Sequence, residues 1–210
     1  MTQLLEITHE DIGQLTNFQL TDLLRRLLHL EANHFNIAAR SIAVSLNITV
    51  RDGGEDGRVQ WSGGPASTDY IPNRLTMFQC KAMDIGPAAC GKELCRKDSD
   101  QLKPQVESVL DAEGTYVLLT TQALNQLLIQ ERLTEMRKAI RTAGKSYAAT
   151  ADLHIYDANR IQAWTNCYIP AIIAVCLWRG RQLLPGMQTW EHWSERTEYQ
   201  RFQQFPPLTL

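Results

Sequence analysis

The segment 51–82 constrains the fold of this 210-residue chain more than any other part of the sequence. It begins with a glycine-rich turn, RDGGEDGRVQW, continues through a polar loop, and ends with MFQCKA. Glycine permits the unusual backbone dihedrals of a tight turn, and the segments that flank the loop have the composition of strands. The pattern predicts a turn that carries Asp56, a β-hairpin, and a strand over 77–83 that carries Gln79 and Lys81.

The strand over 77–83 presents its side chains alternately to the two faces of the sheet. Gln79 and Lys81 therefore share one face, and Cys80 points to the other. With Asp56 in the neighbouring turn, an acid, an amide oxygen and a lysine converge on one edge of the sheet. A divalent metal held by oxygen ligands lowers the pKa of a bound water and neutralises charge on a phosphate. This combination predicts cleavage of phosphodiester bonds.

The order of these motifs resembles the PD-(D/E)XK nuclease superfamily in its Q-x-K form. The matching features are, in chain order, a helix that carries Glu31, the turn GGEDGR, the strand FQCK and the strand YVLLTT. The likeness covers roughly the first four-fifths of the chain. More narrowly, the sequence is similar to Mrr-type restriction nucleases and to the N-terminal nuclease effector domains of antiviral STAND NTPases.

The resemblance implies a magnesium site, in which Mn²⁺ would substitute for Mg²⁺. Asp56 would be the main carboxylate ligand, and Gln79 would give an amide oxygen where relatives have Glu or Asp. The backbone carbonyl of Cys80 would add an oxygen, and Glu31 would be a further ligand, directly or through water. Lys81 would orient the attacking water or hold the phosphate. The expected catalytic residues are thus Asp56, Gln79, Lys81 and Glu31, with one or two metal ions.

Each of these residues also has an ordinary interpretation. Asp56 fits an Asx-type turn residue, which is common in glycine-rich turns. Gln79 fits a solvent-facing strand residue, Lys81 fits a lysine at a strand edge, and Glu31 fits a solvated glutamate on a helix surface. The nuclease interpretation depends on Asp56, Gln79 and Lys81 occurring together in this order.

Double-stranded DNA is the expected substrate, although the chain has no overall basic excess. Its 21 Lys and Arg residues and 23 Asp and Glu residues give a net charge of −2. Because phosphate neutralisation supplies much of the affinity for DNA, binding would depend on a local basic face, on self-association as a dimer or tetramer, or on both. No recognition helix is visible, so low sequence specificity is expected. The candidate DNA contacts, each of which also fits a solvated surface charge, are Arg58, Arg74, Lys92, Arg96 and Lys97.

The apolar periodicity along the chain predicts one α/β domain. Strands are expected at 41–50, 57–61, 77–83, 116–120 and 152–156. Helices are expected at 16–34, 87–96, 101–112, 122–142, 158–166 and 169–178. This order predicts a restriction-endonuclease-like mixed central sheet with helices on both faces, formed by residues 1–180. Residues 181–210 have the composition of a linker or of the start of a next module, which indicates a fragment of a longer protein.

Cellular location follows from what the sequence lacks. There is no signal-peptide pattern and no apolar run long enough to span a membrane, and the five cysteines lie mostly in apolar segments. A cytoplasmic protein with reduced thiols and no membrane partner is expected.

Two other motifs are incomplete in this sequence. Cys90 and Cys95 lack a second pair of zinc ligands nearby, so a zinc site is not expected there. The segment 143–146 ends like a phosphate-binding loop but lacks the preceding strand and the first glycine of that motif, so it is not expected to bind phosphate.

The expected function is metal-dependent endonucleolytic cleavage of double-stranded DNA. The likeness to STAND effector domains implies a role in defence against phage. Cleavage would be switched on when modules outside these residues bind a phage protein and the chain oligomerises. Two alternatives stay open: a non-catalytic module of nuclease fold that binds DNA or mediates assembly, and the cleavage module of a modification-dependent restriction enzyme.

Overall fold

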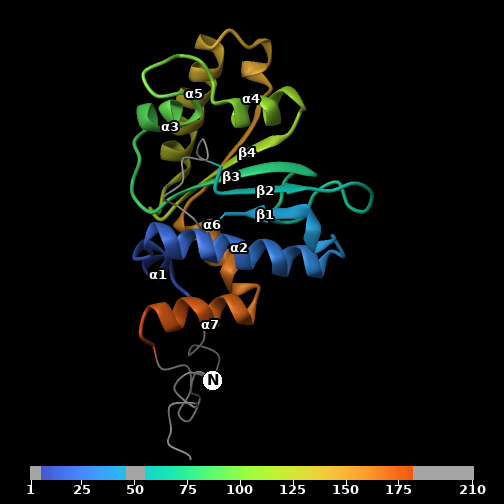
Figure 1. The fold of residues 1–210 in the computed structure, drawn as a ribbon. Coiled ribbons are helices and arrows are strands. Elements are labelled where there is room, and N and C mark those ends of the chain that lie inside the picture. The colour runs from blue at the N-terminus through green and yellow to red at the C-terminus, as the bar shows by residue number, and fades with distance from the viewer. Residues whose placement is uncertain (1–5, 46–54, 182–210) are drawn as a thin grey trace, which may run out of the picture.

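A five-stranded mixed sheet forms the centre of the fold (Figure 1). The computed structural model describes residues 6–45 and 55–181. The first three strands pair antiparallel and the last three pair parallel, so the spatial order of the strands equals their order in the chain. The strands are β1 (Ile42–Val44), β2 (Gly57–Gln60), β3 (Leu75–Lys81), β4 (Thr115–Thr120) and β5 (Asp152–Tyr156). The predicted α/β class with a mixed sheet is confirmed.

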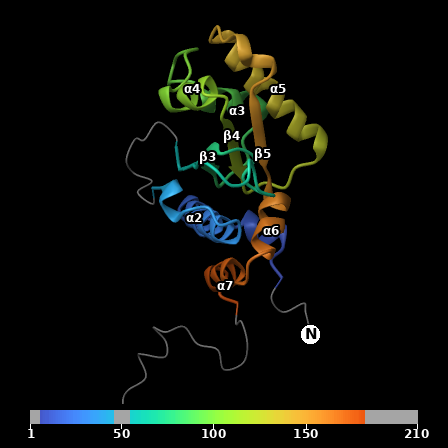
Figure 2. The same cartoon turned by 90° about the vertical axis from the view of Figure 1, so that its right-hand side faces the viewer.

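Helices cover both faces of this sheet (Figures 1 and 2). One face carries α1 (His9–Gly13), α2 (Asn17–His34), α6 (Ala158–Asn166) and α7 (Ile169–Trp178). The opposite face carries α3 (Pro87–Leu94), α4 (Pro104–Asp111) and α5 (Gln126–Thr142). Two short 3₁₀ helices, η2 (Ala39–Ser41) and η3 (Ser146–Ala149), complete the described elements. None of the described helices is both long enough and apolar enough to cross a membrane.

Side-chain alternation along β3 divides the apolar interior into two cores. Phe78 and Cys80 belong to the core beneath α2, whereas Met77 belongs to the core beneath α3, α4 and α5. Gln79 lies on the Met77 side, because strand side chains two residues apart share a face. The same rule directs Lys81 to this side. The face that α3 to α5 cover is therefore the one that carries Gln79 and Lys81.

Local sequence signals explain where the helices begin. Thr16 caps α2 in a reciprocal capping box with Gln19, whose side chain accepts a hydrogen bond from the Thr16 backbone N–H. Pro87 and Pro104 stand in the first turns of α3 and α4, where a missing N–H has no cost. Asn125 caps α5, which therefore begins four residues later than predicted.

Other predicted boundaries shift for tertiary reasons. A β-bridge between Cys95 and Leu102 ends α3 at Leu94 and delays α4, so neither helix extends as far as the periodicity predicts. The segment expected as a lead-in contains α1, which packs against α6. The last two helices match their predicted ranges. Parts of two predictions, residues 46–50 of the first strand and the 182–210 linker, lie outside the described residues.

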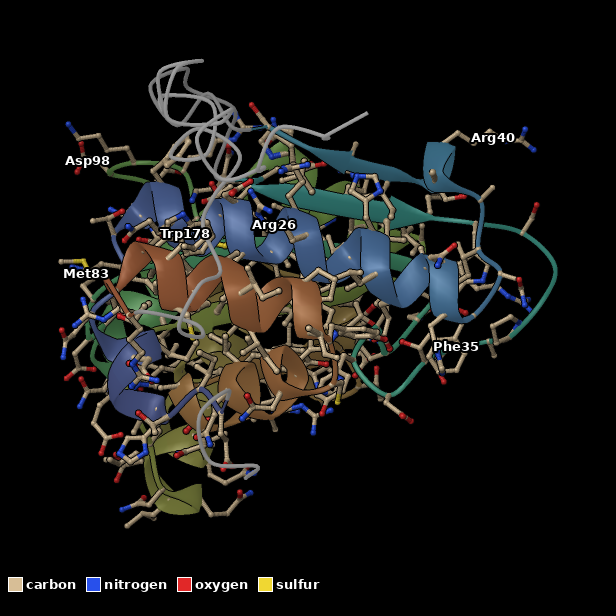
Figure 3. The ribbon with its side chains drawn as sticks, turned by 90° about the horizontal axis from the view of Figure 1, so that it is seen from below. Arg26, Phe35, Arg40, Met83, Asp98 and Trp178 are labelled. Atoms are coloured by element: carbon tan, nitrogen blue, oxygen red, sulfur yellow. The ribbon has the colours of Figure 1, made fainter. Side chains whose placement is uncertain are left out.

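The final helix, α7, lies beside α2, on the face of the sheet that α1, α2 and α6 also cover (Figure 3). The guanidinium of Arg26 lies 5.7 Å from the ring centroid of Trp178, a cation–π distance. At the other end of the α2–α7 pair, Tyr168 donates a hydrogen bond to Glu31 at 2.6 Å. The two ends of α7 are thus both held to α2.

Candidate functional site

The carboxylate of Glu93 interacts with two side chains of β3, those of Gln79 and Lys81. Gln79 Nε2 donates to Glu93 Oε2 at 2.6 Å, and Lys81 Nζ lies 2.9 Å from Glu93 Oε1. Lys103 is the residue just before α4, and its Nζ lies 3.5 Å from Glu93 Oε2. Glu93 therefore lies among one amide and two ammonium groups, at the carboxyl-terminal end of the central strand.

The register of α3 directs Glu93 to this position. Cys90 and Leu94 anchor the helix in the core below it, and both are fully buried. Glu93 lies between them on the helix surface and leans over the end of β3, where its side chain retains 25% of its exposure. Burial disfavours the charged form of Glu93, but the hydrogen bond and charge of Lys81, with help from Lys103, hold its pKa below the ordinary value. The carboxylate is thus ionised at neutral pH.

A buried tyrosine fixes the orientation of the Gln79 amide. Tyr116 on β4 donates its hydroxyl hydrogen to Gln79 Oε1 at 2.6 Å, and both residues are buried. Burial first, and then the charge of Glu93, raises the pKa of Tyr116 well above its usual range. The hydroxyl therefore stays protonated as a donor, which turns the Gln79 NH₂ group toward Glu93.

Asp56 completes the site from the start of β2. Its backbone N–H donates to Phe78 O at 3.1 Å, which places it opposite the middle of β3. The Cys80 backbone N–H donates to Asp56 Oδ2 at 2.7 Å, so the carboxylate lies against the backbone between Gln79 and Lys81. The structure therefore brings together Asp56, Gln79 and Lys81, as the strand alternation and the hairpin predict. The turn glycines at 53 and 54 lie outside the described residues.

The side chain and the backbone of Cys80 lie in different environments. Its thiol belongs to the core on the α2 side, and burial raises the thiol pKa well above its usual range. Its backbone N–H faces Asp56, and the N–H and C=O of one strand residue point toward the same neighbouring strand. The Cys80 carbonyl is accordingly directed to the Asp56 side of β3, as its expected role as an oxygen ligand requires.

Glu31 does not belong to this site, which corrects its expected role as a catalytic residue and metal ligand. Thr21 on α2 contacts Cys80, and Glu31 lies about 15 Å further along the helix axis because a helix rises about 1.5 Å per residue. Figure 3 shows the same separation: Met83, close after Lys81, and Phe35, close after Glu31, lie at opposite ends of the view. The solvated-surface interpretation also fails, since Glu31 is 1% exposed.

The partners of Glu31 are aromatic. Its Oε2 accepts hydrogen bonds from Trp164 Nε1 at 3.0 Å and from Tyr168 OH at 2.6 Å. Its Oε1 is buried and has no hydrogen-bond partner among the residues that the structure describes. Trp164 in turn stacks on Tyr70, with ring centroids 5.2 Å apart. Glu31 thus joins α2 to α6 and α7.

The predicted DNA contacts separate into three groups. Arg74 donates to the backbone oxygens of Gly64 and Pro65 at the far end of β3 from Lys81, so it holds the hairpin loop and does not lie at the site. Arg58 lies on β2 close to Asp56 and forms a bidentate salt bridge with Glu55. The other three, Lys92, Arg96 and Lys97, line a groove beside α3.

The oxygen groups at the end of β3 form a donor set that suits Mg²⁺. Asp56 and Glu93 supply two carboxylates and the Cys80 carbonyl supplies a neutral oxygen, whereas the Gln79 amide oxygen accepts from Tyr116 in this structure. Mg²⁺ needs only one or two carboxylates because it keeps several of its waters. Within the described ranges, no group of three or more His, Cys, Asp and Glu residues could hold a metal ion. The donor set at the end of β3 contains no His or Cys side chains, which are the usual ligands of a structural zinc site.

Sequence reasoning missed Glu93 and Lys103. Glu93 lies near the end of α3, the helix that follows β3 in the chain. The sequence marks it only as a charged residue next to Leu94, which together with Cys90 forms the buried side of the helix. That signal is common on surface helices. The packing of α3 against the sheet was needed to assign it.

Comparisons of this chain with models of protein families, with curated proteins and with solved structures find no match.

Proposed function

We propose that this chain is a metal-dependent nuclease that hydrolyses phosphodiester bonds of double-stranded DNA. The observation that carries the proposal is the convergence of Asp56, Gln79, Lys81 and Glu93 at the end of the central strand. Two carboxylates, two neutral oxygens and a lysine within one small region are the groups that this reaction uses. The mixed sheet with helices on both faces is also the arrangement that the resemblance to PD-(D/E)XK nucleases implies.

Asp56 and Glu93 would hold Mg²⁺ or Mn²⁺, with the Gln79 amide oxygen and the Cys80 carbonyl as further ligands. When bound, the ion supplies charge neutralisation on the phosphate and a lower pKa for a bound water. Lys81 would donate hydrogen bonds to the attacking water or to a phosphate oxygen. Glu93 supplies the second carboxylate that a Gln at position 79 removes from the common family pattern.

The amide of Gln79 has two orientations that serve different purposes. In the structure its NH₂ group satisfies the Glu93 carboxylate and its oxygen accepts from Tyr116. A half-turn of the amide would place the oxygen next to Glu93, and Tyr116 could then accept from the NH₂ group, because a phenol both donates and accepts. Gln79 thus supports an ion-free arrangement and an ion-binding one without a buried unpaired group.

The resemblance to STAND effector domains supports a wider proposal. The nuclease would act in the cytoplasm against phage, and its activation would require self-association as a dimer or tetramer, triggered by a phage protein that other modules bind. The net charge of −2 supports this part, because a domain without a basic excess gains affinity for DNA when several copies bind together.

A plasmid-nicking assay tests the proposal. The chain is assayed at high concentration, and also fused to a tetramerising coiled coil, with Mg²⁺ or Mn²⁺. Asp56→Asn and Lys81→Ala should each lower the cleavage rate by on the order of a hundredfold or more, and EDTA should abolish cleavage. Asp69→Asn, an exposed aspartate outside the site, is the matched control and should cleave like the wild type.

Cleavage that survives in both site variants would refute the assignment. If no form cleaves but Mn²⁺ raises the unfolding temperature of the wild type and not of Asp56→Asn, the chain is a metal-binding module without nuclease activity. Preferential cleavage of modified DNA would instead support the restriction-enzyme alternative.

A further inference from the structure

A groove of about 820 Å³ lies beside the candidate site, between α3 and α5. The two helices pack side by side (Figure 1), and they approach closely at Gly91, where a Cβ atom would lie 3.0 Å from the Glu135 backbone oxygen. Residues 96–100 and Lys103 line the groove with the two helices. It is therefore bounded by three separate segments of the chain.

The groove is basic although the chain is acidic. Five basic side chains and three acidic ones line it, whereas the whole chain has a net charge of −2. Glu135 is already paired with Lys138 at 3.2 Å. Lys92 and Lys97 are exposed, and neither forms an ion pair with any residue in the described ranges. Their charges remain available to an anion in the groove.

Lys103 makes the groove continuous with the candidate site. Its Nζ lies 3.5 Å from Glu93 Oε2, and the same side chain lines the groove. An anionic chain that contacts Lys81 would therefore reach the groove by way of Lys103, and these two ammonium groups flank the Glu93 carboxylate. A long polyanion matches this geometry better than a single small anion.

The loop that forms one wall is held in place by the backbone. Arg96 N–H donates to Gln101 O at 2.8 Å, and Lys103 N–H donates to Leu94 O at 2.8 Å. These bonds flank the bridge between Cys95 and Leu102 and close the loop at its base. The basic side chains on this loop are thus presented from a fixed backbone, which reduces the entropy lost when they bind a ligand.

We propose that this groove holds the sugar–phosphate backbone of the DNA strand on one side of the bond that is cut, with Lys92 and Lys97 as phosphate contacts. The proposal rests on the proposed nuclease function and adds the path of the substrate. Lysine contacts to phosphate supply affinity and position without reading sequence. The groove would be the local basic face that a chain of net negative charge needs.

Equilibrium binding tests the groove independently of cleavage. Anisotropy of a fluorescein-labelled DNA duplex is measured in EDTA over a range of salt concentrations, for the wild type and for the double variant Lys92→Gln/Lys97→Gln. The double variant should bind on the order of tenfold more weakly, and the slope of log K against log salt should be smaller by about two. The matched control, Arg40→Gln/Arg141→Gln, removes two exposed charges outside the groove and should retain the wild-type slope.

Three outcomes would overturn the groove assignment. One is a double variant with the affinity and slope of the wild type; another is a wild type that shows no salt-dependent binding at low salt. A third is displacement of the duplex by ATP at an equal phosphate concentration, which would assign the groove to small phosphate ligands. Because no cleavage occurs in EDTA, the plasmid-nicking assay decides the nuclease proposal separately.

Discussion

Glu93 and Glu31 are both helical glutamates held by hydrogen bonds, but their surroundings differ. Glu93 keeps 25% of its side-chain exposure and lies between Lys81, Lys103 and the amide of Gln79. Glu31 is 1% exposed and accepts hydrogen bonds from Trp164 and Tyr168. Cations and solvent therefore surround the first carboxylate, whereas aromatic rings enclose the second.

The difference shows which glutamate can exchange its partners. A carboxylate at the edge of solvent can replace an ammonium partner by a metal ion at small cost, because both stabilise its charge. A carboxylate enclosed by aromatic rings would need rearrangement of those rings before an ion could enter, and ions lose much hydration energy on burial. Glu93 is accordingly suited to ligand exchange, and Glu31 is suited to joining helices.

The largest expected effect is that of Glu93→Gln on cleavage. The variant keeps the shape and hydrogen-bonding capacity of residue 93 but removes the carboxylate charge, so cleavage should fall on the order of a hundredfold. Mn²⁺ should also raise the unfolding temperature less than in the wild type, since metal binding to the folded state is weakened. Glu131→Gln, exposed on α5, is the control. Wild-type cleavage and Mn²⁺ stabilisation in Glu93→Gln would remove Glu93 from the site.

Substitution of Glu31 should lower the stability of the fold without a direct effect on metal binding or cleavage. Glu31→Ala leaves the buried Trp164 N–H and the Tyr168 hydroxyl without their acceptor, which should lower the free energy of unfolding by about 3 kcal/mol. Glu31→Gln keeps an acceptor and should cost about 1 kcal/mol. Denaturant titration measures both changes. Mn²⁺ affinity should stay unchanged in the folded variants, and a lower affinity would return Glu31 to the metal site.

Asp22 on α2 provides a third carboxylate, and its partners are two arginines of the same helix. Burial acts against its charged form, yet hydrogen bonds from Arg26 and Arg25 at 2.9 Å and 2.7 Å hold its pKa below the ordinary value. A lowered pKa in the folded state adds stability above the unfolded pKa, and that stability is lost as the pH falls through the folded pKa. Asp22→Asn should therefore cost about 1 kcal/mol at neutral pH, allowing for solvent screening of the exposed arginines.

The pH dependence of that cost is the diagnostic part. The difference in the free energy of unfolding between wild type and Asp22→Asn should shrink as the pH falls below the unfolded pKa of about 3.9, and it should be lost once the pH is below the lowered pKa of the folded state. Urea titrations at several pH values measure it, with Asp69→Asn as the control that should show no difference. A cost that stays constant at low pH would mean that the Asn side chain perturbs α2 by some route other than charge.

Much of the fold was predictable because its signals are local. The strand at 152–156 and the helices at 158–166 and 169–178 match the structure, since alternation, capping residues and Pro170 act within a few residues. The boundaries of α3, α4 and α5 were less accurate. The Cys95–Leu102 bridge, which the apolar periodicity does not reveal, decides where α3 ends and α4 begins, and the cap at Asn125 sets the start of α5 inside a longer apolar pattern.

The candidate site was predictable in part for the same reason. Alternation along one strand was enough to place Gln79 and Lys81 on one face, and the hairpin was enough to place Asp56 near them. The role of Glu31 was predicted wrongly because a position on the first helix does not reveal which end of that helix lies over the site. Arg74 was misplaced similarly, since it lies at the opposite end of β3 from Lys81.

By itself, the sequence determined the class of fold, the order of the strands and of the helices after α1, and the face of the central strand that carries Gln79 and Lys81, because these depend on periodicity and short-range capping. The tertiary structure alone decided that Glu93 is the carboxylate beside Lys81, that Glu31 joins helices, and that Lys103 links the site to a basic groove. These roles depend on the packing of α3 and α2 against the sheet. Such packing is the sum of many weak contacts between residues far apart in the chain, and no single stretch of sequence encodes it.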